Sequence, residues 1–537
     1  MKYTTYLFTC FWVLFVCIHS VDAQRRIIMN NPANKLQLAE YAIASLYVDT
    51  LNEAKMVESA IIKMLEQLDP HSTYSTPKEV KELTEPLQGK FDGIGIQFNM
   101  VEDTLLVIQP VSGGPSEKVG ILAGDRIVQV GDSIIAGVKL STDKIMSMLR
   151  GPKGTLVKVK VLRRGVNDLL DFTIKRDKIP VFSLDASYLI DKRVGYIKVN
   201  RFGATTHKEF MEALQSLQKK GMKDLILDLQ GNGGGYLEAA IDIANEFLDK
   251  KELIVYTVGR RNPRSEFQAK GNGQFKTGRL IVLIDEYSAS ASEIVTGAVQ
   301  DWDRAVVVGR RSFGKGLVQR PIDLPDGSMI RLTVARYYTP SGRCIQKPYE
   351  KGIKDYNQDL INRYNSGEMM SADSIHFPDS LKYLTQRLQR PVYGGGGIMP
   401  DYYVPVDTTV YTKYHRQMSL QGLLLKYHFQ LVDSHRKEWT DKYKNFDEFS
   451  RKFTISDEMM QRLVAMGKEE KIEYADEAEY QKSVPLMKLQ LKALIARDLW
   501  DMSEYYQVIN ESNESVQKAL ELLKEKDFEK LLLKKNR

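Results

Sequence analysis

The sequence predicts a multidomain α/β protein with N-terminal helices, a small β-rich domain, an α/β core with a mixed sheet, and a helical C-terminal extension. The length of 537 residues is the first indication, because one ordinary domain holds roughly 150 residues. The second is that short apolar runs alternate with helical stretches over residues 194–308, which is typical of a largely parallel sheet. The third is that apolar residues recur at helical spacing near both ends of the chain.

The composition argues against several classes of protein. Lys and Arg number 76 against 69 Asp and Glu, and a net charge of +7 with no dense basic stripe indicates no nucleic-acid partner. Cys344 is the one cysteine after the leader described below, so no internal disulfide is expected. His71, His207 and His376 are scattered and lack ligand spacing, so we expect no metal and no cofactor.

Residues 1–23 are predicted to be a signal peptide. Lys2 precedes a nearly continuous apolar run from Leu7 to Ile18, and Ala23 offers a small residue at the cleavage position. The run is short for a membrane span, which needs about 20 residues, although an uncleaved anchor stays an alternative. No later stretch has 18 consecutive apolar residues. We therefore expect export across the inner membrane, with no membrane span once the signal is removed.

Residues 24–88 are predicted to be an N-terminal helical region. Apolar residues recur at helical spacing over 36–68, and the Asp-Pro-His-Ser sequence at 69–72 ends this run as a turn. Residues 76–79 (Thr-Pro-Lys-Glu) indicate the start of a further helix, with proline in its first turn.

Residues 89–177 are predicted to be a compact domain of short strands with one helix over 142–149. This domain resembles a PDZ domain in the loop Gly93-Ile94-Gly95-Ile96, in the segment Ala123-Gly124-Asp125-x-Ile127, and in the helix around Ile145. In PDZ domains a peptide adds as an edge strand, and loop amides hold its terminal carboxylate. The resemblance implies that Gly93, Ile94, Gly95 and Ile96 bind a peptide. A barrel that serves only as a spacer is the alternative.

Residues 178–410 are predicted to be the α/β core, with a polar, irregular insertion at 347–390. Residues 411–537 are predicted to be a helical extension rich in lysine and glutamate. The strands of the core are expected at 195–199, 225–229, 280–284 and 306–308.

A serine-rich segment, Ser288-Ala289-Ser290-Ala291-Ser292, lies at the start of a predicted helix in the core. Ser290 and Glu293 form a capping-box pattern, and capping alone is one interpretation. A hydroxyl at a helix N-terminus can also act as a nucleophile, because that end of a helix favours negative charge. The residues themselves leave Ser288, Ser290 and Ser292 as three candidates.

Lys315 lies between two glycines, 25 residues after Ser290. A free lysine has a pKa of about 10.4, but burial without a carboxylate partner lowers the pKa and creates a usable base. Gln319 is four residues further on and could hold the amine in place. A solvated surface lysine is one alternative. A phosphate-binding loop is another, although Gly316 stands where that loop needs serine or threonine.

A glycine-rich loop follows the strand that ends near Asp228. Gly233, Gly234 and Gly235 would let the backbone approach a substrate and offer amides to an oxyanion. A plain tight turn between a strand and a helix is the alternative.

Over roughly residues 40–410 the chain resembles the C-terminal processing peptidases, also called tail-specific proteases. The resemblance implies a Ser/Lys dyad with Ser290 as nucleophile, Lys315 as general base and Gln319 orienting the lysine. It also implies an oxyanion hole made by the amides of Ala291 and Gly234. The motifs that carry it are Leu68 to Ser72, the PDZ residues above, Asp228 to Gly235, Ser288 to Glu293, Phe313 to Gln319, Tyr338 to Arg343, and the acidic residue Asp301, interpreted as structural support.

The resemblance implies a periplasmic serine endopeptidase of a Gram-negative bacterium that binds protein or peptide substrates through their C-terminal tails. The chain differs from the family at Gln230, where arginine is usual, and this puts in doubt a salt bridge near the glycine loop. A non-catalytic PDZ scaffold that keeps the peptidase fold is the alternative function. The helices at 35–85 and 411–537 could pair between chains, which would give a homo-oligomer.

Overall fold

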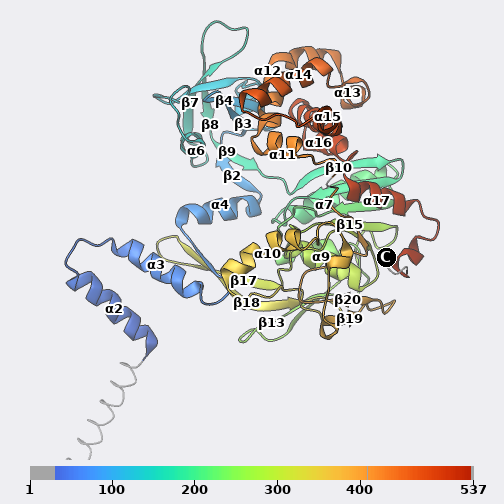
Figure 1. Cartoon of the computed structure of the whole chain (residues 1–537). Coiled ribbons are helices and arrows are strands. Elements are labelled where there is room, and N and C mark those ends of the chain that lie inside the picture. The colour runs from blue at the N-terminus through green and yellow to red at the C-terminus, as the bar shows by residue number, and fades with distance from the viewer. Residues whose placement is uncertain (1–30, 408, 534–537) are drawn as a thin grey trace, which may run out of the picture. The chain divides into compact units, whose positions relative to one another are not determined.

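The computed structural model describes residues 31–407 and 409–533 (Figure 1). The predicted signal peptide, residues 1–23, lies outside the described residues. Contacts within the chain divide it into two compact units, with the division between Tyr74 and Ser75. Among the described residues no helix combines the length and apolar character that a membrane span requires.

The first unit contains helices α2 (Pro32–Leu46) and α3 (Glu53–Leu65), and the short strand β1 (Thr73–Ser75) crosses the division. Both helices begin at an asparagine whose side chain accepts a backbone N–H, as an N-cap does. Many of their apolar side chains are exposed: Leu46, the last residue of α2, is 81% exposed, and Val48, in the segment between the two helices, is 88% exposed.

Helix α4 (Pro77–Gln88) opens the second unit, and a capping box between Thr76 and Glu79 starts it. A six-stranded antiparallel sheet with helix α6 (Thr142–Leu149) follows, and their buried side chains form one cluster. Strand β3 is at the end of the strand order β3-β4-β5-β7-β8. The elements of this domain are β2 (Lys90–Gly93), β3 (Ile96–Val101), β4 (Thr104–Pro110), α5 (Pro115–Lys118), β5 (Arg126–Val130), β6 (Ser133–Ile134), β7 (Leu156–Leu162), β8 (Leu170–Lys175) and β9 (Asp177–Pro180).

The core contains a mixed sheet in the order β10-β11-β12-β15-β16-β21. Strand β10 is antiparallel to β11, and the other neighbours are parallel. Strands β11, β12, β15 and β16 are buried on both faces and consist mostly of apolar residues, as the sequence predicts, whereas β21 is only half-buried. The bounds are β10 (Leu184–Asp191), β11 (Val194–Val199), α7 (Thr206–Lys219), β12 (Asp224–Asp228), α8 (Leu237–Asn245), β15 (Leu280–Ile284), α9 (Ala291–Asp301), β16 (Val306–Gly309) and β21 (Tyr402–Tyr403).

The two faces of this sheet are covered by different parts of the chain. Strands β11, β12, β15 and β16 are neighbours in the sheet in the order in which they occur along the chain, so right-handed connections place α7, α8 and α9 on one face. The other face is covered by α16 (Met502–Ile509), α17 (Glu514–Leu523) and the turn η3 (Phe528–Leu533). Helix α17 contacts β12, β15 and β16, and α16 contacts β10; Figure 1 shows α17 beside β15. The C-terminal elements α16, α17 and η3 therefore cover the second face of the core sheet.

A second, antiparallel sheet lies within the core: β17 (Leu317–Asp323) and β13 (Leu253–Val258) both pair with β18 (Met329–Tyr338), and β14 (Ser265–Gln268) pairs with β13. The insertion at 347–390 is less irregular than the sequence predicts. It contains helix α10 (Ile353–Asn365), the 3-10 turns η1 (Ala372–Ser374) and η2 (Asp379–Leu381), and strand β19 (Lys382–Leu384), which pairs with β20 (Pro391–Tyr393). Buried contacts to the core stabilise this polar segment, as described below.

The C-terminal extension is helical, as predicted, and most of it has a hydrophobic core of its own. Aromatic residues are prominent in this core, where Phe453 contacts both Trp439 and Phe449. The helices before α16 are α11 (Lys413–Leu420), α12 (Leu423–Lys442), α13 (Phe446–Lys452), α14 (Asp457–Glu469) and α15 (Glu477–Leu499).

Candidate active site

Three loops meet at the carboxyl edge of the core sheet. They follow β12 (residues 228–235), β15 (residues 285–290) and β16 (residues 309–316). These strands are parallel neighbours, so their carboxyl ends share one edge, where ligands bind in open α/β sheets. The predicted serine, lysine and glycine-rich loop are all in these three segments.

Ser290 differs from the other two candidate serines in its backbone. Its φ of 54° and ψ of −111° place it in a conformation that L-residues rarely adopt, directly before α9. Ser288 and Ser292 are fully buried, and their hydroxyls donate to the carbonyls of Leu229 and Asn232. Ser290 is half-buried. The strained, accessible residue is therefore the middle serine, while its neighbours hold the loops together.

Gly234 lies against Ser290. A Cβ atom on Gly234 would be 2.9 Å from the Cβ of Ser290 and 3.0 Å from the nitrogen of Ala291, and the φ of Gly234 is +102°. Glycine is required here for both reasons. Ala291 is the first residue of α9, so its N–H has no acceptor within the helix. The N–H of Gly234, in contrast, donates to Oδ1 of Asn232 at 2.8 Å.

Glu293 joins the serine loop to the lysine loop. Its carboxylate accepts from the backbone N–H of Ser290 (2.8 Å) and from that of Lys315 (2.9 Å). It also accepts from the Ser312 hydroxyl and the Gly314 N–H. The side chain is 1% exposed. Burial raises the pKa of Glu293, and these hydrogen bonds oppose the shift because they favour the ionised form.

Tyr337 joins the same two residues from β18. Its hydroxyl donates to the carbonyl of Lys315 at 2.7 Å and contacts that of Ser290 at 3.2 Å. Burial raises the pKa of Tyr337 well above its ordinary value of 10.0, so the hydroxyl keeps its proton and remains a donor. A third connection runs from the N–H of Phe313 to the carbonyl of Ser288. The backbones of Ser290 and Lys315 are thus held at a fixed separation.

Lys315 and Gln319 are both half-buried. Gly314, with φ of +88°, and Gly316 flank the lysine closely enough that a Cβ on either would approach backbone atoms of Gly397 or Gln346. Gln319 is on β17, beside a register shift relative to β18, and its amide donates to the Thr333 hydroxyl at 3.4 Å.

The insertion holds the lysine loop from outside. Glu368 accepts from the guanidinium groups of Arg311 and Arg363, with both ion pairs at 2.7 Å. Arg363 also donates to the carbonyls of Arg311 and Ser312. Arg363 and Glu368 are 4% and 6% exposed. The Lys347 ammonium lies 4.0 Å from the ring centroid of Phe313. Charged contacts therefore fix the segment that leads to Lys315.

The remaining predicted residues are in or next to the loop between β2 and β3, and in α9. Gly93 ends β2, Ile96 begins β3, and Gly95 has a φ of +73°. Asp301 is fully buried and pairs with Arg343 at 2.7 Å, which fits the structural role expected for it.

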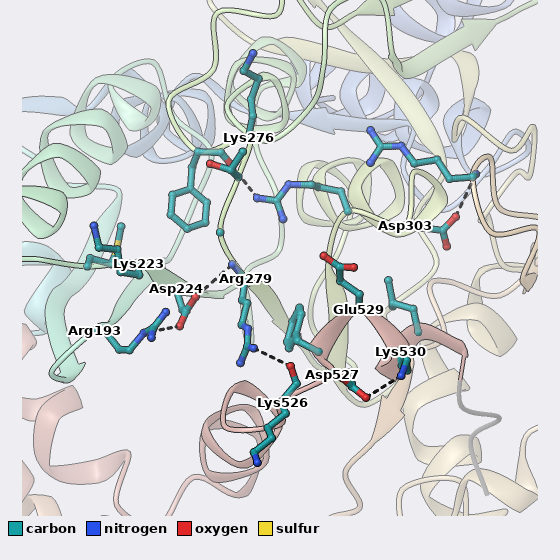
Figure 2. A pocket seen from close by; sticks show the side chains of 18 of the residues that line it. Arg193, Lys223, Asp224, Lys276, Arg279, Asp303, Lys526, Asp527, Glu529 and Lys530 are labelled. Carbon is teal, nitrogen blue, oxygen red and sulfur yellow. Dashed lines mark hydrogen bonds and ion pairs between the residues drawn. The ribbon is translucent and has the colours of Figure 1, made fainter.

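A cavity of about 1360 Å³ lies at the opposite, amino edge of the core sheet. Figure 2 shows Arg193, Asp224 and Arg279 there, which precede β11, begin β12 and precede β15. Most of its charged groups already contact one another or backbone carbonyls, as the Arg193–Asp224 and Lys530–Asp527 pairs do. It lies away from Ser290, so we place the active site at the carboxyl edge.

Comparison with known proteins identifies the family. Residues 93–175 match the PDZ domain, residues 193–355 match peptidase family S41, and residues 414–501 match a family of unknown function (DUF8443). The carboxy-terminal processing protease CtpA of Bacillus subtilis is 36% identical over 344 residues, which are 64% of this chain and 72% of that protein. The carboxy-terminal-processing protease of Bartonella bacilliformis is 36% identical over 343 residues (62% and 78%). The carboxyl-terminal-processing protease of Synechocystis is 39% identical over 335 residues (61% and 76%).

The fold and these relatives define a serine-type endopeptidase with a PDZ domain. The chain belongs to peptidase family S41, the carboxy-terminal processing proteases, and the multidomain α/β fold that the sequence predicts is confirmed.

Sequence reasoning missed two features of the site. The sequence pattern indicates Glu293 only as part of a helix cap, although its position three residues after a candidate nucleophile is a usable signal. Nothing in the sequence points to Tyr337, because its contact with both loops depends on how β18 pairs with β17.

Proposed function

We propose that this protease cleaves near the C-terminal tails of its substrates with a Ser/Lys dyad. The oxygen of Ser290 attacks the scissile carbonyl, and neutral Lys315 takes the hydroxyl proton. Lys315 then gives this proton to the leaving amine, and water hydrolyses the acyl-enzyme. Gln319 orients the lysine. The observation that carries the proposal is the double connection of Ser290 to Lys315 through Glu293 and Tyr337.

Two further observations support this assignment. Ser290 has the strained backbone, whereas Ser288 and Ser292 are buried and already hydrogen-bonded. Lys198, another buried lysine near the glycine loop, pairs with Asp228 at 3.0 Å. The Lys198 ammonium is thus already engaged by a carboxylate and by the Gln230 carbonyl.

The proposed oxyanion hole consists of the N–H groups of Ala291 and Gly234. Because the Gly234 N–H donates to Asn232 in this structure, the proposal includes a rearrangement. The oxyanion takes the place of the Asn232 Oδ1 atom as the acceptor. The hole is thus complete only with substrate bound.

The PDZ domain is proposed to select the substrate. Strand β3 is at the end of its sheet, so a peptide can pair with it beside α6. The loop Gly93-Ile94-Gly95-Ile96 would hold the terminal carboxylate. We also propose that the enzyme is exported to the periplasm of a Gram-negative bacterium by the signal at residues 1–23.

A Ser290→Ala variant tests the dyad. It should lose cleavage of an unstructured polypeptide with an apolar tail, while its thermal unfolding matches that of the parent. Lys315→Ala should behave in the same way. Cleavage by Ser290→Ala at the parental rate would overturn the proposal, and continued binding of the tail by a variant without cleavage would separate recognition from chemistry.

A homo-oligomer formed through the terminal helices is a further proposal. The exposed apolar residues of α2 and α3 support it, because such side chains are commonly covered by a partner. Light scattering coupled to gel filtration measures the mass, and a monomer at high concentration would exclude this assembly.

A further inference from the structure

Gln230, in the glycine loop, contacts the start of helix α17. The amide of Asn513 donates to Oε1 of Gln230 at 3.1 Å, and Nε2 of Gln230 donates to the Ser515 hydroxyl at 3.4 Å. Asn513 is the N-cap of α17, and Ser515 is in its first turn. Both are more than 280 residues from Gln230 in the sequence. The oxygen and the nitrogen of the Gln230 amide are thus both hydrogen-bonded to residues at the start of α17.

The backbone of Gln230 is held by a buried ion pair. Its N–H donates to Asp228 at 2.8 Å, and its carbonyl accepts from the Lys198 ammonium. Lys198 is 6% and Asp228 1% exposed. The hydroxyl of Tyr196 donates to the same carboxylate at 2.5 Å. A buried pair of this kind depends on the exclusion of water and on complete hydrogen bonding.

Helix α16, in the C-terminal segment, packs against this ion pair. The Tyr506 ring packs near Tyr196 (6.4 Å between ring centroids), and the Lys198 ammonium lies 5.9 Å from the Tyr506 ring. The amide of Asn510 donates to the Tyr188 hydroxyl at 2.9 Å. Residues of α16 and α17 therefore surround the groups that hold Gln230.

The same loop leads to the catalytic serine. Four residues after Gln230, Gly234 contacts Ser290 and Ala291. Between them, the N–H of Gly231 donates to Asp285, and the carbonyl of Asn232 accepts from the N–H of Ala289 and the Ser292 hydroxyl. Because Gly231 and Asn232 are hydrogen-bonded to the serine loop in this way, a displacement of Gln230 is transmitted along the glycine loop to Gly234.

We propose that the start of α17 positions the glycine loop for catalysis, with Asn513 and Ser515 acting through Gln230. They are positioning residues, because they contact neither substrate nor the reacting atoms. This inference rests on the proposed function, in which Gly234 turns its N–H from Asn232 to the oxyanion. Because hydrogen bonds hold Gln230 in place, that rearrangement is confined to the loop residues that follow Gln230. Loosening of Gln230 would leave peptide binding by the PDZ domain intact and would slow the chemical step.

The test separates capping of α17 from the contact to Gln230. Asn513→Ser keeps a good N-cap but is too short to reach Gln230. Asn513→Asp keeps the cap, and the Gln230 amide can turn over to donate to the carboxylate and accept from the Ser515 hydroxyl. Gln230→Ala removes the contact from the other side. The full-length proteins are compared on one fluorogenic peptide with an apolar C-terminal tail.

Arg279→Ala is the matched control. Arg279 holds the same C-terminal segment to the core, through the carbonyls of Leu523 and Lys526, but at the amino edge of the sheet (Figure 2). It should lower the melting temperature and leave kcat within about twofold of the parent. This control measures how loosening of the C-terminal segment affects kcat when the contact to Gln230 is intact.

We expect Gln230→Ala and Asn513→Ser to lower kcat between about 10- and 100-fold, with KM within twofold, because misplaced oxyanion donors affect the transition state. Asn513→Asp should restore kcat. Parental kcat in Gln230→Ala and Asn513→Ser, together with an inactive Ser290→Ala, would overturn the inference alone. A kcat that follows melting temperature across all variants, Arg279→Ala included, would also overturn it. An active Ser290→Ala would overturn the proposed function, and the inference with it.

Discussion

The serine side and the lysine side of the active site are supported by different chemistry. The serine side comprises the loops at 228–235 and 285–291, and its outer support is α17, through apolar packing and the neutral amide of Gln230. The lysine side comprises residues 309–316, and its outer support is the insertion at 347–390, through the ion pairs of Glu368 with Arg311 and Arg363.

The difference indicates how each outer support can be broken. The contact of α17 with the glycine loop runs through one neutral side chain, whereas the position of the lysine loop depends on one buried carboxylate shared by two arginines. In the proposed mechanism the base is an amine that must be accurately placed, and the charged support lies on the side of this proposed base. Glu293 and Tyr337 then couple the two sides.

The largest effect is expected from breaking that coupling. Glu293→Ala removes the acceptor of N–H groups on both sides, and each donor left unpaired in a buried site costs about 1–3 kcal/mol. We expect kcat to fall more than about 100-fold, because Ser290 and Lys315 lose their common anchor. Steady-state kinetics and thermal unfolding measure the two effects.

Asp401→Ala is the control for Glu293→Ala. Asp401 is also a buried carboxylate, and it accepts from the Val307 N–H and from Arg390, away from both loops. It should lose stability with a much smaller change in kcat. Equal losses of kcat in the two variants would mean that Glu293 acts only through stability.

An intermediate effect is expected on the lysine side alone. Glu368→Ala leaves Arg363 and Arg311 without their shared partner, and removal of one partner of a buried pair costs about 3–5 kcal/mol. The free energy of unfolding from urea titration should fall by this order, and kcat should fall with KM unchanged. An unaltered kcat in the folded Glu368→Ala protein would show that the insertion does not position Lys315.

Much of this arrangement could be predicted from the sequence, because it depends on local pattern. The parallel strands are continuous apolar runs, and the glycine loop and the capping-box serine follow directly from residue order. The start of helix α4 and its capping box can likewise be predicted from the four residues Thr76 to Glu79.

The supports of the site could not be predicted, because they depend on contacts between distant segments. The insertion is polar in sequence, yet Arg363 is buried once it meets Glu368. The glycines at 394–397 suggest a flexible loop, but the N–H groups of Gly395 and Gly397 donate to the carbonyls of Cys344 and Ile345. Likewise, no local signal connects Gln230 to Asn513.

The smallest effect is expected from a charged contact outside both supports, His207 with Glu246 at 2.9 Å. The hydrogen bond that the His207 ring donates to the Glu246 carboxylate raises the pKa of His207 above its ordinary value of 6.5. The folded state therefore binds this proton more tightly, so the stabilisation is complete below about pH 6.5 and is lost as the pH rises through the folded-state pKa. Because the His207 side chain is 38% exposed, screening limits the effect to below about 1 kcal/mol.

His207→Gln should abolish this small dependence of the unfolding free energy on pH and leave kcat unchanged at each pH. Urea titrations of parent and variant between pH 6 and pH 8 measure it. The variant then provides a background without the titration of His207, in which any remaining change of kcat over this range comes from other groups. A change in kcat caused by His207→Gln itself would mean that the α7 face of the sheet also positions the catalytic loops, and the division into two supports would be too simple.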